Sequence, residues 1–304
     1  MNAVVRPIDF TDVADYVGTP LLGPSGTVHT ISTHFPPSSP GSLSFCTQIS
    51  GTVVNAPAPA LVITLPELSS TLRDADYSVV VSDHPKYEVA RLAQNQLCSR
   101  PSRKIHPKAH IGPDVKIGQN VSIGPGSVLD GLIQIEDNCV IGANVCIMHN
   151  VIIGSGSTIL NGGVIGETPY SFGFGPKNHS IRFPATGRVI IGRNVEIGNN
   201  VVISRGVSDD TVLSDDCRVN DLAHIGNTVF VGKRSLIMAN CDISARVAIG
   251  EECWIGQSAV CIQAIRIGNN VQIGAAAVVT RDIPDNVVAF GSPAKIQGYR
   301  GKSE

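Results

Sequence analysis

The chain has 304 residues, a formal net charge of −2 and only 16% charged residues. This charge balance argues against a nucleic-acid-binding surface and against a polybasic membrane-binding surface. Only 5% of the residues are aromatic, whereas 31 are glycine. Such a composition is typical of a stacked repeat with a thin core, and less so of one large globular core.

Targeting signals and metal motifs are not evident. No apolar run reaches the roughly 18 residues that a transmembrane helix needs, and the start of the chain carries acids and lacks the apolar stretch of a signal peptide. The eight cysteines form no Cys-x-x-Cys pair. We therefore expect a cytoplasmic protein with reduced cysteines, no metal site and no membrane span.

The first hundred residues show no regular repeat. They contain two strand-like runs, "ALVITLP" (residues 60–66) and "YSVVVSD" (residues 77–83), followed by a helix-like segment at residues 84–97. We predict a small α/β domain over residues 1–100, joined to the rest of the chain at "SRPSRK".

Aliphatic residues recur at every sixth position through most of the remaining chain. The series runs from Ile105 to Ile165, resumes from Ile191 to Ile203, and continues from Leu213 to Val279 with Cys261 at one position. A period of six fits neither a helix nor a simple alternating strand. It indicates short strands separated by corners, three to a coil, and so a mainly β protein with a parallel β-helix of about nine coils.

A second inward position follows from the same period. The fourth residue after the aliphatic one is also small or apolar, as at Val121, Cys139, Val195 and Cys241. Two inward residues per strand fill a narrow prism, so we expect these cysteines to be small buried side chains. The Gly or Asn that often follows the aliphatic residue is expected to tolerate the tight bend.

Two insertions interrupt the period. One adds four residues at 208–211, and a longer one occupies residues 167–188. A thin column cannot bury either insertion, so both must project outward. The longer loop contains Phe172, Phe174 and Phe183, which suggests packing on a neighbouring chain, over a ligand, or back on its own column. We expect the β-helix to span residues 101–290 and a tail to follow at 291–304.

The sequence resembles a known family over residues 30–296. "SPGSLSF" (39–45), "SVVVSDHPKYEVARL" (78–92), "SFGFGP" (171–176) and "GSPAK" (291–295) occur in the order seen in the lipid A UDP-acylglucosamine N-acyltransferase family. The resemblance implies a left-handed β-helix, a uridine-binding N-terminal domain and a homotrimer with sites between chains. It also implies a nucleotide-linked amino sugar as substrate.

The chain departs from that family at its site. Asn227 and Ala264 stand where the family has histidines, and the segment "VVTRDIPDNVVAFGSPAK" is instead similar to the close of CoA-dependent sugar acetyltransferases. The acyl-carrier-protein-binding helices of the family have no counterpart here. The resemblance to the CoA-dependent enzymes implies acetyl-CoA, or another acyl-CoA, as donor.

His224 is the best candidate for a general base. Acyl transfer to an amine needs a group that removes a proton near neutral pH, which is the usual role of histidine. We expect His224 to sit at a corner of the column and point outward, with Asn227 holding the acceptor or the carbonyl through its amide. The alternatives are substrate binding, a surface role, or attack without a side-chain base.

Other candidates follow from residue type and from the resemblance. His149 shares a face with Asn227 at a distance of about three coils, or ~14 Å. Phe45 matches the family position that stacks on uracil, while His179 and Phe174 in the long loop could contact substrate. Basic residues suit donor phosphates and glycines leave room for a pantetheine arm; the candidates for donor binding are Arg281, Lys295, Gly256 and Gly274.

Three functions are consistent with these features. The first is transfer of an acyl group, most simply acetyl from acetyl-CoA, to the amine of a nucleotide-linked amino sugar for polysaccharide biosynthesis. The second is an acyl-carrier-protein-dependent N-acyltransferase of the lipid A type. The third is a non-catalytic scaffold or nucleotide-sugar-binding protein, which the loss of the family histidine at Asn227 favours.

Overall fold

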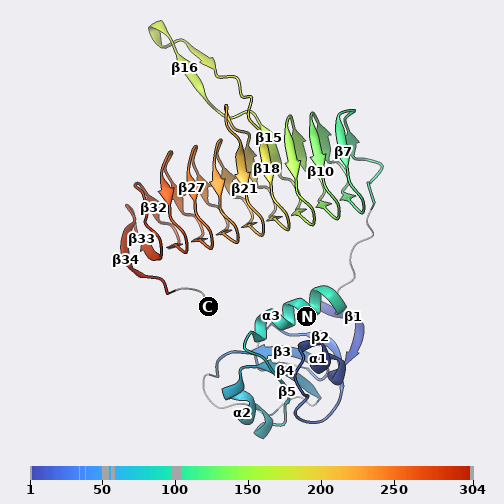
Figure 1. Cartoon of the computed structure of the whole chain (residues 1–304). Coiled ribbons are helices and arrows are strands. Elements are labelled where there is room, and N and C mark those ends of the chain that lie inside the picture. Colours follow the sequence, from blue (N-terminus) through green and yellow to red (C-terminus); the bar gives the residue numbers. More distant parts are fainter. Residues whose placement is uncertain are drawn as a thin grey trace. The chain divides into compact units, whose positions relative to one another are not determined.

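The computed structural model describes residues 2–33, 35–37, 39–49, 55, 59–97 and 104–301. The chain divides into two compact units, Met1–Pro101 and Ser102–Glu304. Most of the expected junction at residues 99–104 lies outside the described residues. Figure 1 shows the two units.

The N-terminal unit is a five-stranded sheet with short helices. The strands lie in sequence order; β1 pairs antiparallel with β2 and the others pair in parallel. Leu43, Leu61 and Ile63 are fully buried between the sheet and helices α1 and α3. The elements are β1 (Asn2–Asp9), α1 (Phe10–Val17), β2 (Thr27–Ile31), β3 (Ser42–Cys46), β4 (Ala60–Thr64), η1 (Pro66–Leu68), α2 (Ser69–Asp74), β5 (Ser78–Val81), α3 (Pro85–Leu92) and η2 (Ala93–Leu97).

The second unit is a column of stacked coils with three parallel sheets, which we name after one strand of each. The β23 sheet contains β6 (His110–Ile111), β9 (Val128–Asp130), β12 (Cys146–Met148), β15 (Val164–Glu167), β20 (Val202–Ser204), β23 (His224–Ile225), β26 (Asp242–Ile243), β29 (Val260–Cys261) and β32 (Val278–Val279). The β24 sheet contains β7 (Val115–Ile117), β10 (Ile133–Ile135), β13 (Val151–Ile153), β18 (Val189–Ile191), β21 (Thr211–Leu213), β24 (Phe230–Val231), β27 (Ala248–Ile249) and β30 (Arg266–Ile267).

The third sheet closes the prism. The β25 sheet contains β8 (Ser122–Ile123), β11 (Val140–Ile141), β14 (Thr158–Ile159), β19 (Glu196–Ile197), β22 (Arg218–Val219), β25 (Leu236–Ile237), β28 (Trp254–Ile255), β31 (Gln272–Ile273), β33 (Val287–Phe290) and β34 (Lys295–Tyr299). Strand β34 lies in the segment expected to be a tail, but it pairs antiparallel with β33. It therefore covers the edge of the last coil.

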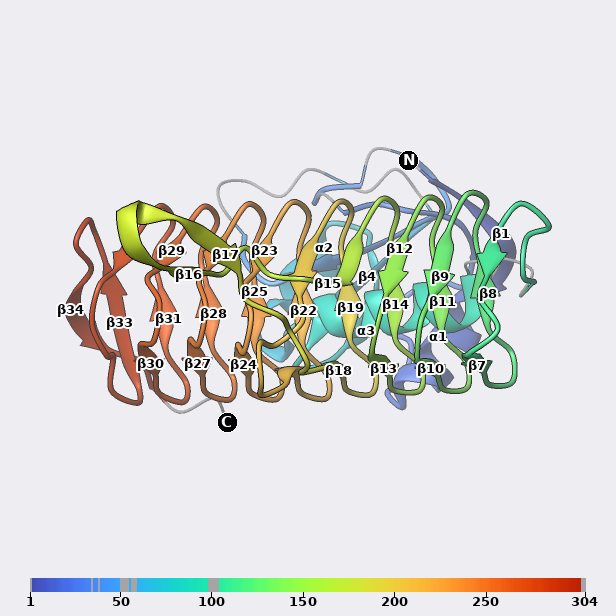
Figure 2. The ribbon, with the colours of Figure 1, turned by 90° about the horizontal axis from the view of Figure 1, so that it is seen from above.

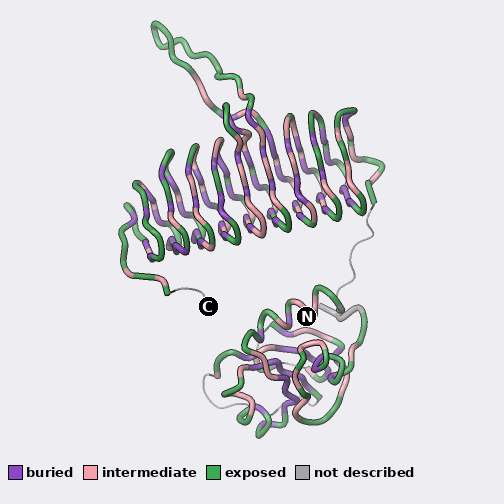
Figure 3. Tube along the Cα trace, viewed as in Figure 1, coloured by how far each residue is buried: buried purple, intermediate pink, exposed green. Residues whose placement is uncertain are grey.

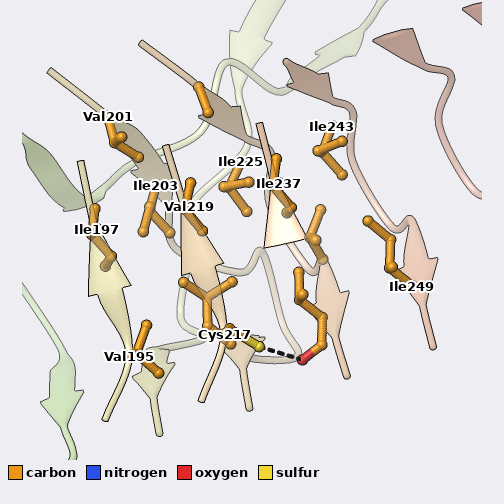
Figure 4. Packing of buried hydrophobic residues seen from close by; sticks show 14 of the residues in the cluster. Val195, Ile197, Val201, Ile203, Cys217, Val219, Ile225, Ile237, Ile243 and Ile249 are labelled. Atoms are coloured by element: carbon orange, nitrogen blue, oxygen red, sulfur yellow. Dashed lines mark hydrogen bonds between the residues drawn. The ribbon is translucent and has the colours of Figure 1, made fainter. Parts of the chain in front are cut away.

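The inward residues of the repeat form one continuous core. Figure 3 shows buried positions inside each coil and exposed positions at the corners. The aliphatic residue of each hexapeptide points inward and stacks on its equivalent one coil later, as Ile225 stacks on Ile243. Figure 4 shows Cys217 among these side chains. Its Sγ donates a hydrogen bond to the carbonyl oxygen of Gly232 at 3.0 Å.

Corner geometry differs in one detail from the expectation. The left-handed residue lies three positions after the aliphatic one, as at Asn120 after Ile117 with φ of 54°. The glycine directly after the aliphatic residue has a different role, because the next coil leaves no space for a side chain. A Cβ on Gly250 would lie 2.6 Å from the carbonyl carbon of Gly268.

Candidate functional site

One edge of the column carries both insertions. At this edge, which we call the arm edge, the chain passes from the β23 sheet to the β24 sheet. Residues 168–188, which we call the arm, leave the column here between β15 and β18 (Figure 1). The smaller insertion leaves one coil later, between β20 and β21. Asn227 lies at the same edge one coil further on.

His224 lies on the flat face beside this edge. It is the first residue of β23, so its position is in a strand and not at a corner as expected. Because its neighbour Ile225 points into the core, strand alternation directs His224 outward. Its side chain is half-exposed, and its Nδ1 lies 2.8 Å from Oδ1 of Asp242.

The pairing of His224 with Asp242 is a product of the repeat. The two residues are 18 positions apart, which is one coil, and they are direct partners in the parallel pairing of β23 with β26. Sequence reasoning missed Asp242. The signal was available, because residues 18 apart in an uninterrupted stretch stack at the parallel-strand spacing of about 4.8 Å.

The hydrogen bond to Asp242 selects the tautomer of a neutral imidazole at His224. An ionised carboxylate only accepts hydrogen bonds, so Nδ1 of His224 is the donor to Asp242. The neutral ring then presents a lone pair at Nε2, which makes no hydrogen bond within the described part of the chain. This arrangement suits a group that accepts a proton from an outside molecule.

The pair interrupts an apolar strip on the outer surface of the β23 sheet. Val202 precedes His224 in this stack and Val260 follows Asp242, and the side chain of Val202 is exposed. The His224–Asp242 pair is therefore a polar spot between aliphatic neighbours. A ligand placed there would contact both polar and apolar atoms.

Asn227 and His149 lie near this pair along the arm edge. The amide of Asn227 is half-buried and makes no side-chain hydrogen bond to a described residue. His149 lies three coils earlier at the same edge, in the left-handed conformation, with Nε2 4.0 Å from Oε2 of Glu167. The expected separation of three coils places His149 too far from Asn227 for direct contact in one chain.

The arm is a hairpin that carries two of the other candidates. Its strands are β16 (Phe172–Phe174) and β17 (Ser180–Arg182), connected through η3 (Pro176–Asn178). The side chain of Phe174 is exposed, and His179 lies just after η3 at the tip, also exposed. Neither residue contacts the His224–Asp242 pair of the same chain through a described hydrogen bond.

The base of the arm is held by the smaller insertion. Arg188 donates to both carboxylate oxygens of Asp210, with the closest contact at 2.7 Å from Nη2 to Oδ2. This guanidinium lowers the pKa of the Asp210 carboxyl. Arg205 donates to the carbonyl oxygens of Ala185 and Gly187. The two insertions therefore form one structural unit, which the sequence did not reveal.

The candidates for donor binding do not come together at one place. Arg281 lies at the arm edge beyond β32 and is exposed, whereas Gly256 and Gly274 lie at the edge between the β25 and β23 sheets. Packing in the column already explains why both positions are glycine. A Cβ on Gly256 would lie 2.6 Å from the backbone nitrogen of Ala275, and a Cβ on Gly274 would lie 2.6 Å from Cβ of Phe290. Lys295 is exposed at the start of β34.

Phe45 lies in the N-terminal unit. It belongs to β3, is half-buried, and packs against the core between the sheet and helices α1 and α3. A cavity of about 530 Å³ opens nearby, at the carboxyl ends of β3, β4 and β5 and the start of α3. Its walls include Thr47, Leu65, Asp83 and Tyr87. Ligands of open α/β sheets bind in this position, and the sequence analysis did not identify it.

Within the described residues, no three His, Cys, Asp or Glu side chains lie close enough together to hold a metal ion. None of the helices in that part of the chain is long and apolar enough to cross a membrane.

Two families of known sequences match the column. The family described as bacterial transferase hexapeptide (six repeats) matches residues 104–131 and 133–167. The hexapeptide repeat of succinyl-transferase matches residues 188–219 and 246–281. The column is therefore similar to the hexapeptide repeats of bacterial transferases, while residues 168–187 of the arm and residues 220–245, which include His224 and Asp242, lie outside the matches.

Curated relatives match only a short stretch. Galactoside O-acetyltransferase of Lactococcus lactis is 48% identical over 52 residues, which is 17% of this chain and 25% of the relative. The dTDP-3-amino-3,6-dideoxy-alpha-D-galactopyranose 3-N-acetyltransferase of Aneurinibacillus thermoaerophilus is 43% identical over 54 residues, or 18% and 28% of the two chains. The chain thus spans about a quarter of the length of these relatives.

Solved structures share the fold of the column. The UDP-N-acetylglucosamine acyltransferase of Francisella novicida superposes with a TM-score of 0.60 at 22% identity, covering 64% of this chain and 70% of that one. The enzyme of the same name from Campylobacter jejuni gives 0.58 at 22%, covering 64% and 75%. The predicted mainly β fold, a left-handed parallel β-helix after a small α/β region, is confirmed. So is the resemblance to hexapeptide-repeat acyltransferases.

Proposed function

We propose that this hexapeptide-repeat protein of the acyltransferase type moves an acyl group, most simply acetyl from acetyl-CoA, to the amine of a nucleotide-linked amino sugar. The single observation that carries the proposal is the hydrogen bond between His224 Nδ1 and Asp242 Oδ1 at 2.8 Å. It leaves Nε2 of an outward-facing imidazole free to take a proton.

The reaction follows from this arrangement. The sugar amine attacks the thioester carbonyl carbon while His224 Nε2 accepts a proton from the nitrogen. Asp242 stabilises the imidazolium that forms. The tetrahedral intermediate then collapses, the carbon–sulfur bond breaks, and the leaving thiolate takes the proton back from Nε2. The products are an amide and free CoA thiol.

The amide of Asn227 has a supporting role in this proposal. It lies at the corner directly after β23 and is not engaged by another described side chain. An amide N–H donates well to a developing oxyanion but cannot act as a base. We assign Asn227 to the carbonyl oxygen of the donor and His224 to the amine.

The substrate class is supported by the relatives. Several of the proteins similar to this chain are named as acetyltransferases of sugars, among them one that acts on a dTDP-linked amino sugar. In the same proposal the donor is a CoA thioester, with Arg281 and Lys295 as separate, alternative contacts for its phosphates, and Phe174 and His179 contact substrate. The N-terminal cavity is a candidate site for the nucleotide, with Phe45 nearby. A cytoplasmic homotrimer completes the proposal.

Thiol release from acetyl-CoA tests the proposal. The wild-type protein is mixed with UDP- and dTDP-linked amino sugars, and free thiol is measured with a chromogenic disulfide. Turnover with one sugar and formation of its N-acetyl product by mass spectrometry would support acyl transfer. Absence of thiol release with every acceptor would reject a CoA donor; an acyl carrier protein donor is then tested in the same assay.

A further inference from the structure

Thr211 is an exception among the inward residues of the β24 sheet. Figure 2 shows the strands of this sheet in one row along the lower side of the column. Thr211 pairs with Val189 in the stack that lies two positions before the repeat aliphatic, and its side chain is fully buried. At every other strand of this sheet that position is a β-branched aliphatic residue; the members are Val115, Ile133, Val151, Val189, Val229, Val247 and Ile265.

The hydroxyl of Thr211 makes two hydrogen bonds to the backbone at the arm edge. Its Oγ1 donates to the carbonyl oxygen of Ser204 and accepts the N–H of Thr228, each at 2.8 Å. Its own backbone is fixed at the base of the arm, because its N–H donates to the carbonyl oxygen of Arg188 at 2.9 Å. A valine would fill the same space but would make neither side-chain bond. The repeat position therefore calls for valine, and the backbone bonds account for threonine.

The bond to Thr228 replaces a backbone bond that the smaller insertion interrupts. At regular corners the left-handed residue donates its N–H to the carbonyl oxygen of the matching corner one coil earlier, as Arg246 donates to Asn227 at 2.9 Å. Thr228 is the left-handed residue of its own corner, with φ of 59°. In the coil before it, the corner is occupied by the smaller insertion, and Thr211 Oγ1 accepts the N–H instead.

This bond fixes the peptide that directly follows Asn227. The carbonyl oxygen of Asn227 accepts the N–H of Arg246, and the N–H of Thr228, in the same peptide plane, donates to Thr211. A β-branched residue adopts the left-handed conformation of Thr228 only at a cost in free energy. Without the hydroxyl of Thr211, the peptide loses one of its two anchors and the strained corner can relax. Rotation of the backbone there changes the direction of the Asn227 side chain.

We propose that Thr211 is a positioning residue for the candidate site. Its hydroxyl holds the corner in the conformation that presents the amide of Asn227 at the arm edge, next to the strand that carries His224. The role rests on the proposed function, in which this amide donates to the oxyanion of acyl transfer. Thr211 is itself buried, so it acts through Asn227 and not on the substrate.

Two variants separate the hydroxyl of Thr211 from the rest of its side chain. Thr211→Val keeps the volume and removes both bonds, whereas Thr211→Ser keeps the hydroxyl. Amide hydrogen exchange is measured in the full-length protein, in peptides that contain residues 226–229. We expect exchange on the order of 5- to 10-fold faster in Thr211→Val, as for the loss of one hydrogen bond, and exchange close to wild type in Thr211→Ser. Unchanged exchange in Thr211→Val would overturn the proposal, whatever the activity shows.

Kinetics test whether the corner matters for turnover. In the thiol-release assay, Thr211→Val is expected to lower kcat by about 10-fold or more with little change in KM, because the amide of Asn227 acts in the transition state. Thr211→Ser should retain most of the wild-type kcat. Asn227→Ala should add little to the loss in Thr211→Val, because both changes disable the same amide. Losses that multiply in the double variant would reject an action of Thr211 through Asn227.

Ser235 provides a matched control at another edge of the column. Its buried hydroxyl also makes two bonds between coils, donating to the carbonyl oxygen of Gly250 at 2.7 Å and accepting the N–H of Cys253 at 3.0 Å. Ser235→Ala is expected to lower the melting temperature about as much as Thr211→Val and to leave kcat unchanged. Equal losses of kcat in the two variants would show general destabilisation and reject the positioning role.

Loss of the acyl-transfer reading and loss of the Thr211 role give different results. A wild-type protein without acyl transfer to any acceptor would reject the proposed function, while exchange at residues 226–229 still decides whether Thr211 holds the corner. An active wild type whose kcat is unchanged in Thr211→Val would reject Thr211 as a positioning residue and leave the proposed function standing.

Discussion

His224 and Asp242 act as one unit because a coil of the column is 18 residues long. The same register that stacks Ile225 on Ile243 inside the prism stacks His224 on Asp242 outside it. The core therefore fixes the hydrogen-bonding geometry of the pair. Neither side chain needs a loop to position it, and sites built on regular elements are held more precisely than sites on loops.

In the proposed reaction, with His224 as the base, substitution of the pair is expected to have two graded effects on turnover. His224→Ala is expected to lower kcat by about 100-fold or more, because the base is removed. Asp242→Asn should cost less, on the order of 10- to 100-fold, because the imidazole remains but the group that fixes its tautomer is weakened. Glu196→Gln, an exposed change on the β25 sheet, is the matched control. Equal rates for Asp242→Asn and wild type would exclude the carboxylate from catalysis.

Cys139, Cys217 and Cys253 lie at a position of the repeat that serine occupies in other coils, as at Ser157 and Ser235. Cys217 donates to the carbonyl oxygen of Gly232 at 3.0 Å, and Ser235 donates to Gly250 at 2.7 Å from the equivalent place. A thiol and a hydroxyl thus fill the same small space and satisfy the same acceptor. This equivalence explains why both residue types occur at this position of the repeat.

The thiol of Cys217 should be unreactive while the protein is folded. Burial raises its pKa to about 11, so at pH 8 only about one molecule in a thousand carries the thiolate, which is the reactive form. Iodoacetamide at pH 8 is therefore expected to leave Cys217 unmodified, as read by peptide mass spectrometry, and to modify it fully in denaturant. Rapid modification of the native protein at this residue would show that the coil opens.

The sequence predicts single site residues better than it predicts their partners, because the partners lie far along the chain. The period of six identified the inward residues, such as Ile225, and the outward direction of His224. It did not identify Asp242, which lies one coil, or 18 residues, beyond His224. The role of Arg188 was also hidden, since its partner Asp210 lies in a separate insertion.

At the scale of elements, the arm depends on the smaller insertion. Residues 205–210 provide the groups that hold the base of the arm, through Asp210 to Arg188 and through Arg205 to the carbonyl of Ala185. An arm of this length without such anchors would move freely. The insertion of four residues is therefore best understood as a support for the arm.

Loss of the Asp210 carboxylate should loosen the arm. Arg188 lowers the pKa of Asp210 in the folded state. The ion pair therefore stabilises the folded state fully at pH values above the ordinary pKa of aspartate, about 3.9. That stability is lost as pH falls through the folded pKa. At pH 7, Asp210→Asn is expected to increase amide hydrogen exchange in residues 168–188.

A similar ion pair at another edge provides the control. Arg193 pairs with Asp215 and also lowers the pKa of that carboxyl, but the pair lies away from the arm. Asp215→Asn should leave exchange in the arm unchanged. Faster exchange in the arm for both variants would mean that general loosening of the column, and not the base of the arm, is responsible.

The corner glycines set the spacing of the coils. A Cβ on Gly250 would lie 2.6 Å from both the carbonyl carbon and the oxygen of Gly268. Both atoms are backbone, so a coil must move to make space. Gly250→Ala is expected to destabilise the column by about 1–3 kcal/mol, measured by denaturant unfolding. Gly298→Ala, where nothing lies within 4 Å, should change stability little; equal effects would exclude coil contact as the cause.

At the scale of the whole molecule, the repeat determines the fold class but not the hand of the coil. A strand–corner period of six requires stacked parallel coils, whereas crossovers between parallel strands are usually right-handed. The left-handed coil came from the resemblance to known acyltransferases, not from the spacing. The same limit applies to the first hundred residues, where short runs such as "ALVITLP" predicted strands without fixing their order.

The two units should unfold as separate cooperative blocks. The buried cluster of the column, from Val121 to Ala294, includes no residue of the N-terminal unit, which has its own clusters around Leu61 and Val62. Each unit therefore has the independent core that a domain needs to fold alone. Calorimetry is expected to give two transitions. A chain reduced to residues 102–304 should keep the transition of the column at an unchanged temperature. A single transition that moves when residues 1–101 are removed would instead show that the two cores stabilise each other.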